Sequence, residues 1–141
     1  MIIALDTNVL VALWNGDDAL NLRALSALEK AYTLGTLVIS GAVFAELLAS
    51  RGSSEIFLHK LLAENEISVD WPVSKDVWRT AGLAYKAYAE RRRKSKQEEP
   101  RRILTDFLIG AHAAENGYSF LTFDDKVFKA AFPKLQILAI K

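Results

Sequence analysis

The sequence of 141 residues contains no cysteine and no uninterrupted apolar run long enough to cross a membrane. The lack of cysteine excludes disulfides and thiolate metal sites, and it fits a reducing cytoplasm, where we expect the protein to reside. A spanning helix needs roughly 18 to 20 apolar residues, so we expect a soluble protein without a membrane partner. The apolar start has no basic leader and is interrupted by Asp6, so we expect it to be structure rather than a signal peptide.

The sequence also has little net charge, since 18 Lys and Arg residues are balanced by 17 Asp and Glu residues. Hydrophobic residues make up 51% of the chain and charged residues 25%, which is typical of a soluble globular protein. The length matches the commonest size of one domain, so we expect residues 1–141 to form a single domain. The positive charges are unevenly placed, and a basic run comprises Arg91, Arg92, Arg93, Lys94, Lys96, Arg101 and Arg102.

Short apolar runs alternate along the chain with segments of helical periodicity. Continuous apolar runs of this length are typical of strands in a parallel sheet that is covered on both faces. The predicted strands lie at 2–5, 36–40, 66–71, 118–123 and 135–140, and the predicted helices at 7–14, 19–35, 41–50, 53–65, 75–96, 103–117 and 124–132. This alternation indicates an α/β fold, with a mostly parallel sheet between helices.

Polar caps and glycines set the expected ends of these helices. The expected N-caps are Asp18, Ser40 and Ser74, and the expected stops are Gly35 and Gly117. In the helix after Asp18, apolar residues recur every third position, a spacing that indicates a helix: Leu22, Leu25, Leu28 and Ala31.

Two acids directly follow predicted strands, namely Asp6 and Asp124. In open α/β sheets the ligand site lies outside the carboxyl ends of the strands, so this placement favours a functional role. Each of these acids could also cap the helix that follows it, and that alternative stays open.

Two further acids, Glu46 and Asp106, lie on predicted helices among small apolar residues. We interpret both as mid-helix acids on core-facing stripes, where capping offers no explanation. Four converging carboxylates would repel one another unless a cation neutralised them. A site made only of carboxylates suits Mg²⁺ or Mn²⁺ rather than zinc, and such sites commonly cleave phosphodiesters.

Three segments, "ALDTNVLVAL", "SGAVFAELL" and "ILTDFLIGAHAAENGYSFLTFDDKVF", resemble PIN-domain ribonucleases, and most of all the VapC toxins of toxin–antitoxin modules. The resemblance extends from Asp6 to Phe128. It implies a PIN-like three-layer sandwich with four or five short strands, and a metal-dependent endoribonuclease that uses Mg²⁺ or Mn²⁺. It also implies a homodimer and a cognate VapB-type antitoxin that blocks the site.

The same resemblance assigns roles to individual residues. It implies that Asp6, Glu46 and Asp106 are the core metal ligands, and that Asp124 completes the cluster directly or through water. The polar residues that would support these acids are Thr7, Asn8 and Thr122. The neighbouring Asp125 is the alternative to Asp124, but the spacing from Thr122 favours Asp124.

The basic run from Arg91 to Arg102 has three possible roles. It could form an RNA-backbone track, because phosphate affinity comes chiefly from Lys and Arg; it could contact an antitoxin or a second protomer; or it could be a solvated charged face. For His59 and His112 we expect a packed or surface role rather than catalysis.

Two other functions compete with a ribonuclease. A phosphotransfer domain with an aspartyl nucleophile would also place an acid after its first strand, but the sequence has neither a DxD pattern at Asp6 nor a lysine at a matching strand end. A PIN-like scaffold that binds RNA or protein without turnover would have no need of four mutually repulsive acids.

Overall fold

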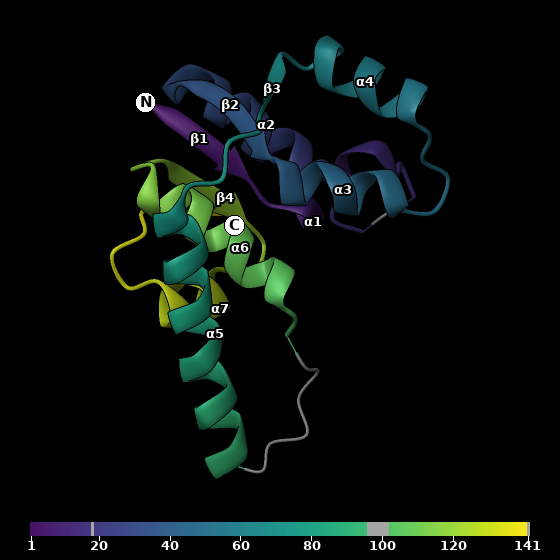
Figure 1. The fold of residues 1–141 in the computed structure, drawn as a ribbon. Helices are drawn as coiled ribbons and strands as arrows, with labels where there is room; N and C mark the ends of the chain where they lie inside the picture. Colours follow the sequence, from purple (N-terminus) through teal and green to yellow (C-terminus); the bar gives the residue numbers. More distant parts are fainter. Residues whose placement is uncertain (18, 96–101, 141) are drawn as a thin grey trace.

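The computed structural model describes residues 1–17, 19–95 and 102–140 (Figure 1). In chain order the elements are β1 (Ile2–Leu5), α1 (Thr7–Trp14), α2 (Asn21–Leu34), β2 (Thr36–Ser40), α3 (Gly41–Ala49), α4 (Glu55–Glu64), β3 (Ile67–Asp70), α5 (Lys75–Ser95), α6 (Leu104–Glu115), β4 (Ser119–Thr122), α7 (Asp125–Ala131) and β5 (Ile137–Ala139).

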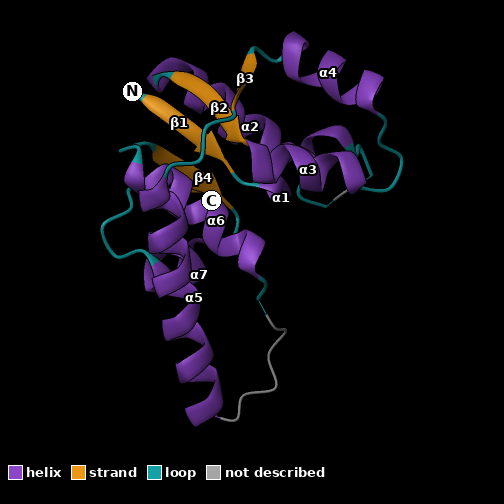
Figure 2. Cartoon of the chain, in the orientation of Figure 1, coloured by secondary structure: helices purple, strands orange, loops and turns teal. Residues whose placement is uncertain are grey.

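The five strands form one sheet in the order β3-β2-β1-β4-β5, and every pairing is parallel. The chain builds outward from β1 to β3 on one side and then returns to build β4 and β5 on the other. Figure 2 shows the strands with α5, α6 and α7 gathered below them and the other helices above and to the right. The prediction of an α/β fold with a parallel sheet is therefore confirmed, and the order reverses between β1 and β4.

The core lies on the central strands because these are apolar on both faces. Ile3, Leu5, Ile39 and Phe120 are at most 1% exposed. On one face, α6 packs against β4 and contributes Phe107, which is also buried. The buried strands make the sheet a rigid base for side chains that follow the strand ends.

The four apolar residues that recur along α2 do not share one face. Leu28 and Ala31 are at most 3% exposed, whereas Leu22 is 78% exposed and Leu25 is 41% exposed. Because a helical turn takes 3.6 residues, a spacing of three residues falls about 60° short of a full turn. Over nine residues, side chains at this spacing therefore move about 180° around the helix. The helix begins at Asn21 without a side-chain cap, and the expected cap Asp18 lies outside the described residues.

Several predicted helix ends are confirmed by local contacts. Ser40 Oγ accepts a hydrogen bond from the Val43 N–H at 3.3 Å, and Ser74 Oγ accepts one from the Val77 N–H at 3.2 Å. Gly117 follows α6 with a φ of +70°, a left-handed conformation that favours glycine. These caps fix where α3 begins and where α6 gives way to β4.

The longest helix is α5, with 21 residues. It buries Val77 and Ala81 and then becomes basic toward Ser95. Across the described part of the chain, no helix combines the length and the apolar character needed to cross a membrane.

Gly110 allows α6 to pack closely on Phe132. A Cβ atom at Gly110 would lie 2.2 Å from Phe132 Cε2 and 3.0 Å from Phe128 Cδ1. We expect Gly110→Ala to lower the free energy of unfolding by about 1–3 kcal/mol, because the ring must be displaced from a packed core. Chemical unfolding measures this change. The matched control is Gly82→Ala on α5, where nothing lies within 4 Å, and it should stabilise the protein. Equal effects of the two substitutions would contradict the packing argument.

A candidate acidic active site

A pocket of about 350 Å³ opens at the carboxyl ends of β1 and β4, where the strand order reverses. The Asp6 N–H donates to the Leu121 carbonyl oxygen at 3.0 Å, which ties the end of β1 to the neighbouring strand. The structure brings all four predicted acids to this pocket, whose lining comprises Asp6, Thr7, Asn8, Val11, Ala12, Leu20, Glu46, Asp106 and Asp124.

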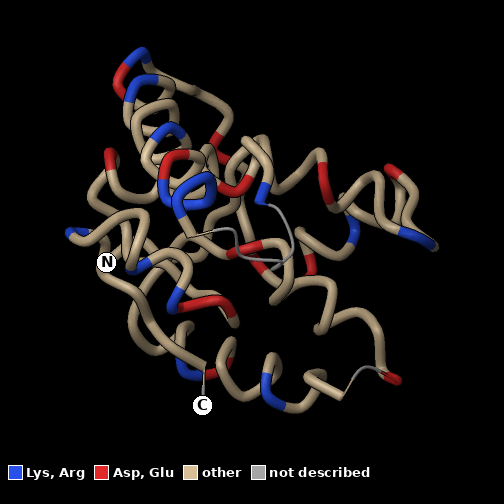
Figure 3. Tube along the Cα trace, turned by 90° about the horizontal axis from the view of Figure 1, so that it is seen from below, with Lys and Arg blue, Asp and Glu red and all other residues tan. Residues whose placement is uncertain are grey.

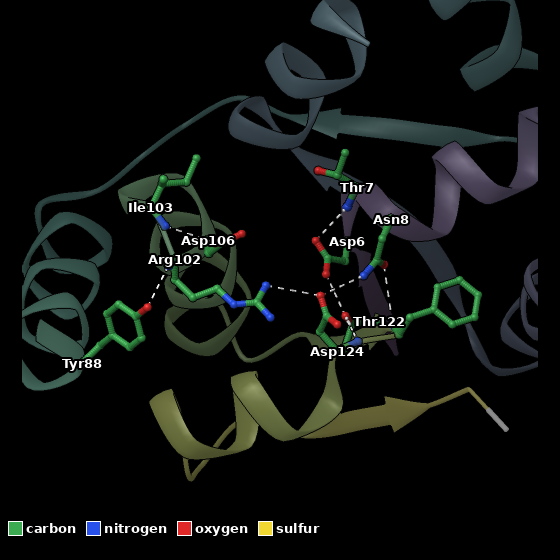
Figure 4. A network of polar contacts seen from close by, with 10 residues as sticks. Asp6, Thr7, Asn8, Tyr88, Arg102, Ile103, Asp106, Thr122 and Asp124 are labelled. Atoms are coloured by element: carbon green, nitrogen blue, oxygen red, sulfur yellow. Dashed lines mark hydrogen bonds and ion pairs between the residues drawn. The ribbon is translucent and has the colours of Figure 1, made fainter. Parts of the chain in front are cut away.

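Asp6 is the most buried of the four acids, with 6% of its surface exposed. One carboxylate oxygen, Oδ1, accepts from the Thr7 N–H at 2.8 Å, and the other, Oδ2, accepts from Thr122 Oγ1 at 2.7 Å (Figure 4). The pKa of Asp6 is raised to about 6, chiefly by burial and to a smaller extent by the nearby charges of Asp124 and Asp106, while the two hydrogen bonds oppose the rise. Asp6 is thus the N-cap of α1 and also part of a polar network that reaches β4.

Glu46 and Asp106 enter the pocket from two different helices. Glu46, on α3, accepts a hydrogen bond at Oε1 from Thr7 Oγ1 at 2.7 Å. Asp106 is the third residue of α6, and its Oδ2 accepts from the Ile103 N–H at 3.4 Å. The interpretation of Asp106 as a mid-helix acid is therefore wrong, because α6 begins only at Leu104 and the carboxylate takes a capping contact in the first turn.

Asp124 contacts the pocket through both its backbone and its side chain. Its N–H donates to Thr122 Oγ1 at 2.9 Å, and its Oδ2 accepts from Asn8 Nδ2 at 3.3 Å. Its side chain forms no capping hydrogen bond to α7, so the capping alternative is wrong for this acid. Asp125 instead forms an ion pair with Lys129 at 3.7 Å, one turn along α7.

The three polar residues predicted to support the acids each bridge two parts of the site. Thr7 joins Asp6 to Glu46, and the single hydroxyl of Thr122 accepts from the Asp124 backbone while it donates to Asp6. Asn8 contacts Asp124 with its amide nitrogen and accepts from the Phe123 N–H at 3.5 Å. Asp6, Glu46 and Asp124 are therefore held by a connected network that spans α1, α3 and the end of β4, whereas Asp106 is held separately by the Ile103 N–H.

The pocket suits a divalent metal ion by its donor chemistry. Four carboxylates are the oxygen ligands that Mg²⁺ and Mn²⁺ prefer, and the effect of Asp124 and Asp106 on the pKa of Asp6 shows that the charges interact. Within residues 1–17, 19–95 and 102–140, however, no group of three or more His, Cys, Asp or Glu side chains is already arranged to hold a metal ion. The assignment of the four acids as ligands stays a prediction.

The basic run divides into two parts in space. Arg91, Arg93 and Lys94 are exposed near the C-terminal end of α5, and Arg92 is half-buried, whereas Lys96 and Arg101 lie outside the described residues. Arg102 contacts a predicted site acid, since its Nη1 lies 3.5 Å from Asp124 Oδ2. In Figure 3, which views the molecule from below Figure 1, basic and acidic positions are interspersed along the trace.

The histidines lie away from the pocket, as predicted. His59 is exposed beside Glu55, at 3.7 Å. His112 is 2% exposed, and its Nε2 lies 2.8 Å from Asp70 Oδ2, which also accepts from the Tyr118 hydroxyl at 3.2 Å. Partial burial and the Asp70 charge raise the pKa of Tyr118. Nothing in the sequence pattern pointed to this contact between β3 and the end of α6.

Comparisons with known proteins identify the family and the fold. The family model described as PIN domain matches residues 3–133. A comparison with curated proteins finds no match.

Among solved structures, the chain is similar to VapBC2 from Rickettsia felis bound to a promoter DNA fragment (TM-score 0.64, 19% identity, 100% of both chains covered). It is also similar to VapBC-1 from nontypeable Haemophilus influenzae (TM-score 0.65, 21% identity, 99% of this chain and 98% of that chain). A third similar structure is Mycobacterium tuberculosis VapC20, a sarcin-ricin loop cleaving toxin (TM-score 0.57, 19% identity, 95% and 98% covered). These likenesses extend over nearly the whole chain and show a shared fold.

Proposed function

Since the chain belongs to the PIN-domain family, we propose that it is a metal-dependent endoribonuclease and the VapC-type toxin of a toxin–antitoxin pair. One observation carries the proposal: four carboxylates from separate parts of the chain line a single pocket at the point where the strand order reverses. The fold shared with VapBC structures and with VapC20 supports it.

In the proposed site, Asp6, Glu46 and Asp106 hold Mg²⁺ or Mn²⁺, and Asp124 completes the set directly or through water. When bound, the cation would lower the pKa of the attacking water and would stabilise negative charge on the phosphate. Thr7, Asn8 and Thr122 orient the carboxylates through the hydrogen bonds described above. One of the carboxylates accepts the proton of the attacking water.

We propose that the protein acts as a homodimer and that a VapB-type antitoxin blocks the pocket by presenting a basic side chain to the acids. The VapBC complexes among the similar structures support an antitoxin partner. The charge of the pocket supports the mode of inhibition, because a guanidinium or ammonium group would pair with carboxylates that otherwise repel one another.

Metal removal tests the proposed activity. Incubation of the protein with a panel of tRNA, ribosomal RNA and mRNA should give discrete cleavage products in Mg²⁺ or Mn²⁺ and none in EDTA, because the carboxylates alone cannot activate water. Gel or sequencing analysis of the RNA ends measures this. RNA binding with no cleavage under any metal condition would instead favour the scaffold without turnover.

The exposed basic residues on α5 carry a separate prediction. Replacing Arg91 and Arg93 by Gln should weaken binding of a single-stranded RNA and flatten its salt dependence, by a slope of about 0.7 for each lost phosphate contact. Fluorescence anisotropy titrations at several KCl concentrations measure this slope. An unchanged slope would leave these residues as a solvated face or a contact for a protein partner.

A further inference from the structure

Arg102, the last residue of the basic run, reaches the acidic pocket. Its Nη1 lies 3.5 Å from Asp124 Oδ2, and its side chain is 32% exposed. Figure 4 shows the guanidinium extending from the start of α6 toward Asp124. This contact joins a basic side chain directly to one of the four acids that line the pocket.

The backbone of Arg102 is held by Tyr88. The Arg102 N–H donates to the Tyr88 hydroxyl at 2.8 Å. The ring of Tyr88, on α5, packs against the ring of Phe107 on α6 with centroids 5.4 Å apart, and Phe107 is buried. Tyr88 therefore links the backbone of Arg102 to the core and fixes the point from which the Arg102 side chain extends.

The contact between Arg102 and Asp124 is loose enough for the guanidinium to leave this carboxylate and bind another anion. Its 3.5 Å separation is longer than the roughly 2.7–2.9 Å of a charge-assisted hydrogen bond. Asp124 Oδ2 also accepts from Asn8, so this carboxylate keeps a donor when Arg102 leaves. A guanidinium binds phosphate with two parallel hydrogen bonds, and four carboxylates without a nearby cation would repel a phosphodiester.

We propose that Arg102 is the phosphate-binding side chain of this site, paired with Asp124 between substrates and transferred to a phosphate of the RNA near the scissile bond. Tyr88 is the positioning residue that fixes the Arg102 backbone. The inference rests on the proposed ribonuclease function, and it adds a binding residue that is distinct from the four acids and from the exposed arginines of α5.

RNA binding in EDTA tests this role, because cleavage is not expected there. With a fluorescein-labelled single-stranded oligoribonucleotide, Arg102→Ala should weaken Kd roughly tenfold at 0.1 M KCl and reduce the slope of log K against log[KCl] by about 0.7. Arg102→Lys keeps the charge and should restore the slope but only part of the affinity, since an ammonium cannot bind the phosphate through a fork.

The role of Tyr88 is tested by a double-mutant cycle. Tyr88→Phe removes the hydroxyl that accepts from Arg102 while it keeps the ring that packs on Phe107. It should weaken RNA binding in the wild-type background and have no further effect when Arg102 is already Ala. An equal loss in both backgrounds would overturn the positioning role.

Arg79→Ala is the matched control for the loss of one arginine. Arg79 is exposed on α5. The hydroxyl of the neighbouring Thr80 donates to Glu115, which lies at the C-terminal end of α6, whereas Asp106 lies at the N-terminal end of the same helix. Nine residues of helix separate those ends by about 14 Å, more than the Debye length at physiological salt, so Arg79→Ala should change Kd by less than about twofold.

An Arg102→Ala variant that binds RNA as tightly as Arg79→Ala would overturn the inference. If the Tm increase that Mn²⁺ causes were then also larger in Arg102→Ala than in the wild type, Arg102 would be only a counter-ion of Asp124. Failure of the proposed function gives a different pattern, in which the wild type cleaves no RNA with Mg²⁺ or Mn²⁺. Cleavage by the wild type together with unchanged RNA binding by Arg102→Ala would refute the role of Arg102 and leave the proposed ribonuclease function standing.

Discussion

Replacing Asp106 by Asn should reduce RNA cleavage roughly 10²–10³-fold, the loss typical of removing one preorganised electrostatic group from an active site. The substitution removes one negative charge from the pocket and almost no volume. The asparagine oxygen can still accept from the Ile103 N–H, which Asp106 contacts at 3.4 Å. We therefore expect a change in unfolding free energy of only about 0.5 kcal/mol. Cleavage rates of a defined RNA and a urea unfolding curve measure the two effects separately.

Asp125→Asn is the matched control for this prediction. It also removes one carboxylate from the first turn of a helix, but Asp125 is paired with Lys129 and does not line the pocket. It should retain cleavage and, when expressed without antitoxin, toxicity. Asp6→Asn and Asp124→Asn should lose both, as Asp106→Asn does. Full activity of Asp6→Asn and Asp106→Asn would refute the assignment of the site, whereas equal losses in all four variants would show a nonspecific charge effect.

The centre of the sheet could be predicted from the sequence because β1 and β2 are largely apolar on both faces. Runs such as residues 2–5 and 36–40 are too short for helices and are bounded by polar residues, so pattern and structure agree. The positions of Asp6 and Asp124 follow from this, because an acid directly after a central parallel strand lies at the carboxyl edge of the sheet.

The buried face and the first residue of a helix are harder to predict from the sequence. A spacing of three residues looks helical over two turns but drifts around the axis over more, so Leu22 is exposed while Leu28 is buried. The apolar Ile103 looks helical in the sequence, which makes Asp106 an interior acid of the predicted helix, whereas Ile103 is the N-cap of α6. This second difference concerns one or two residues at a helix start, where the local signal is weakest.

The contacts of Arg102 lay beyond sequence reasoning for a different reason. The hydrogen bond to Tyr88 joins residues 14 positions apart, and the ion pair to Asp124 joins residues from separate elements. Periodicity reports which face of an element is apolar, but it contains no information on which polar side chains meet across elements. Arg102 was predicted only as one member of a basic run, and its particular place required the packing of α5 on α6.

In metal-free solution, the free energy of unfolding should fall as the pH rises from about 4 to about 7. The pKa of Asp6 is raised from 3.8 to about 6 in the folded protein, chiefly by burial. Between these values the folded state keeps a proton that the unfolded state has released, so rising pH favours unfolding. The stabilisation is complete below the unfolded pKa and is lost as the pH passes about 6; for this one group it amounts to on the order of 3 kcal/mol.

Asp6→Asn isolates this contribution, because asparagine stays neutral at every pH and can still accept from the Thr7 N–H. Urea unfolding in EDTA between pH 4.5 and 7.5 should show the variant gaining stability relative to the wild type as the pH rises, and Asp125→Asn should follow the wild-type profile. Addition of Mg²⁺ or Mn²⁺ at pH 7 should stabilise the wild type more than Asp6→Asn, since a bound cation offsets the buried charge. Parallel pH profiles for the wild type and Asp6→Asn would show that the Asp6 carboxylate is not the destabilising charge, and the argument for a cation at this position would then lose its energetic basis.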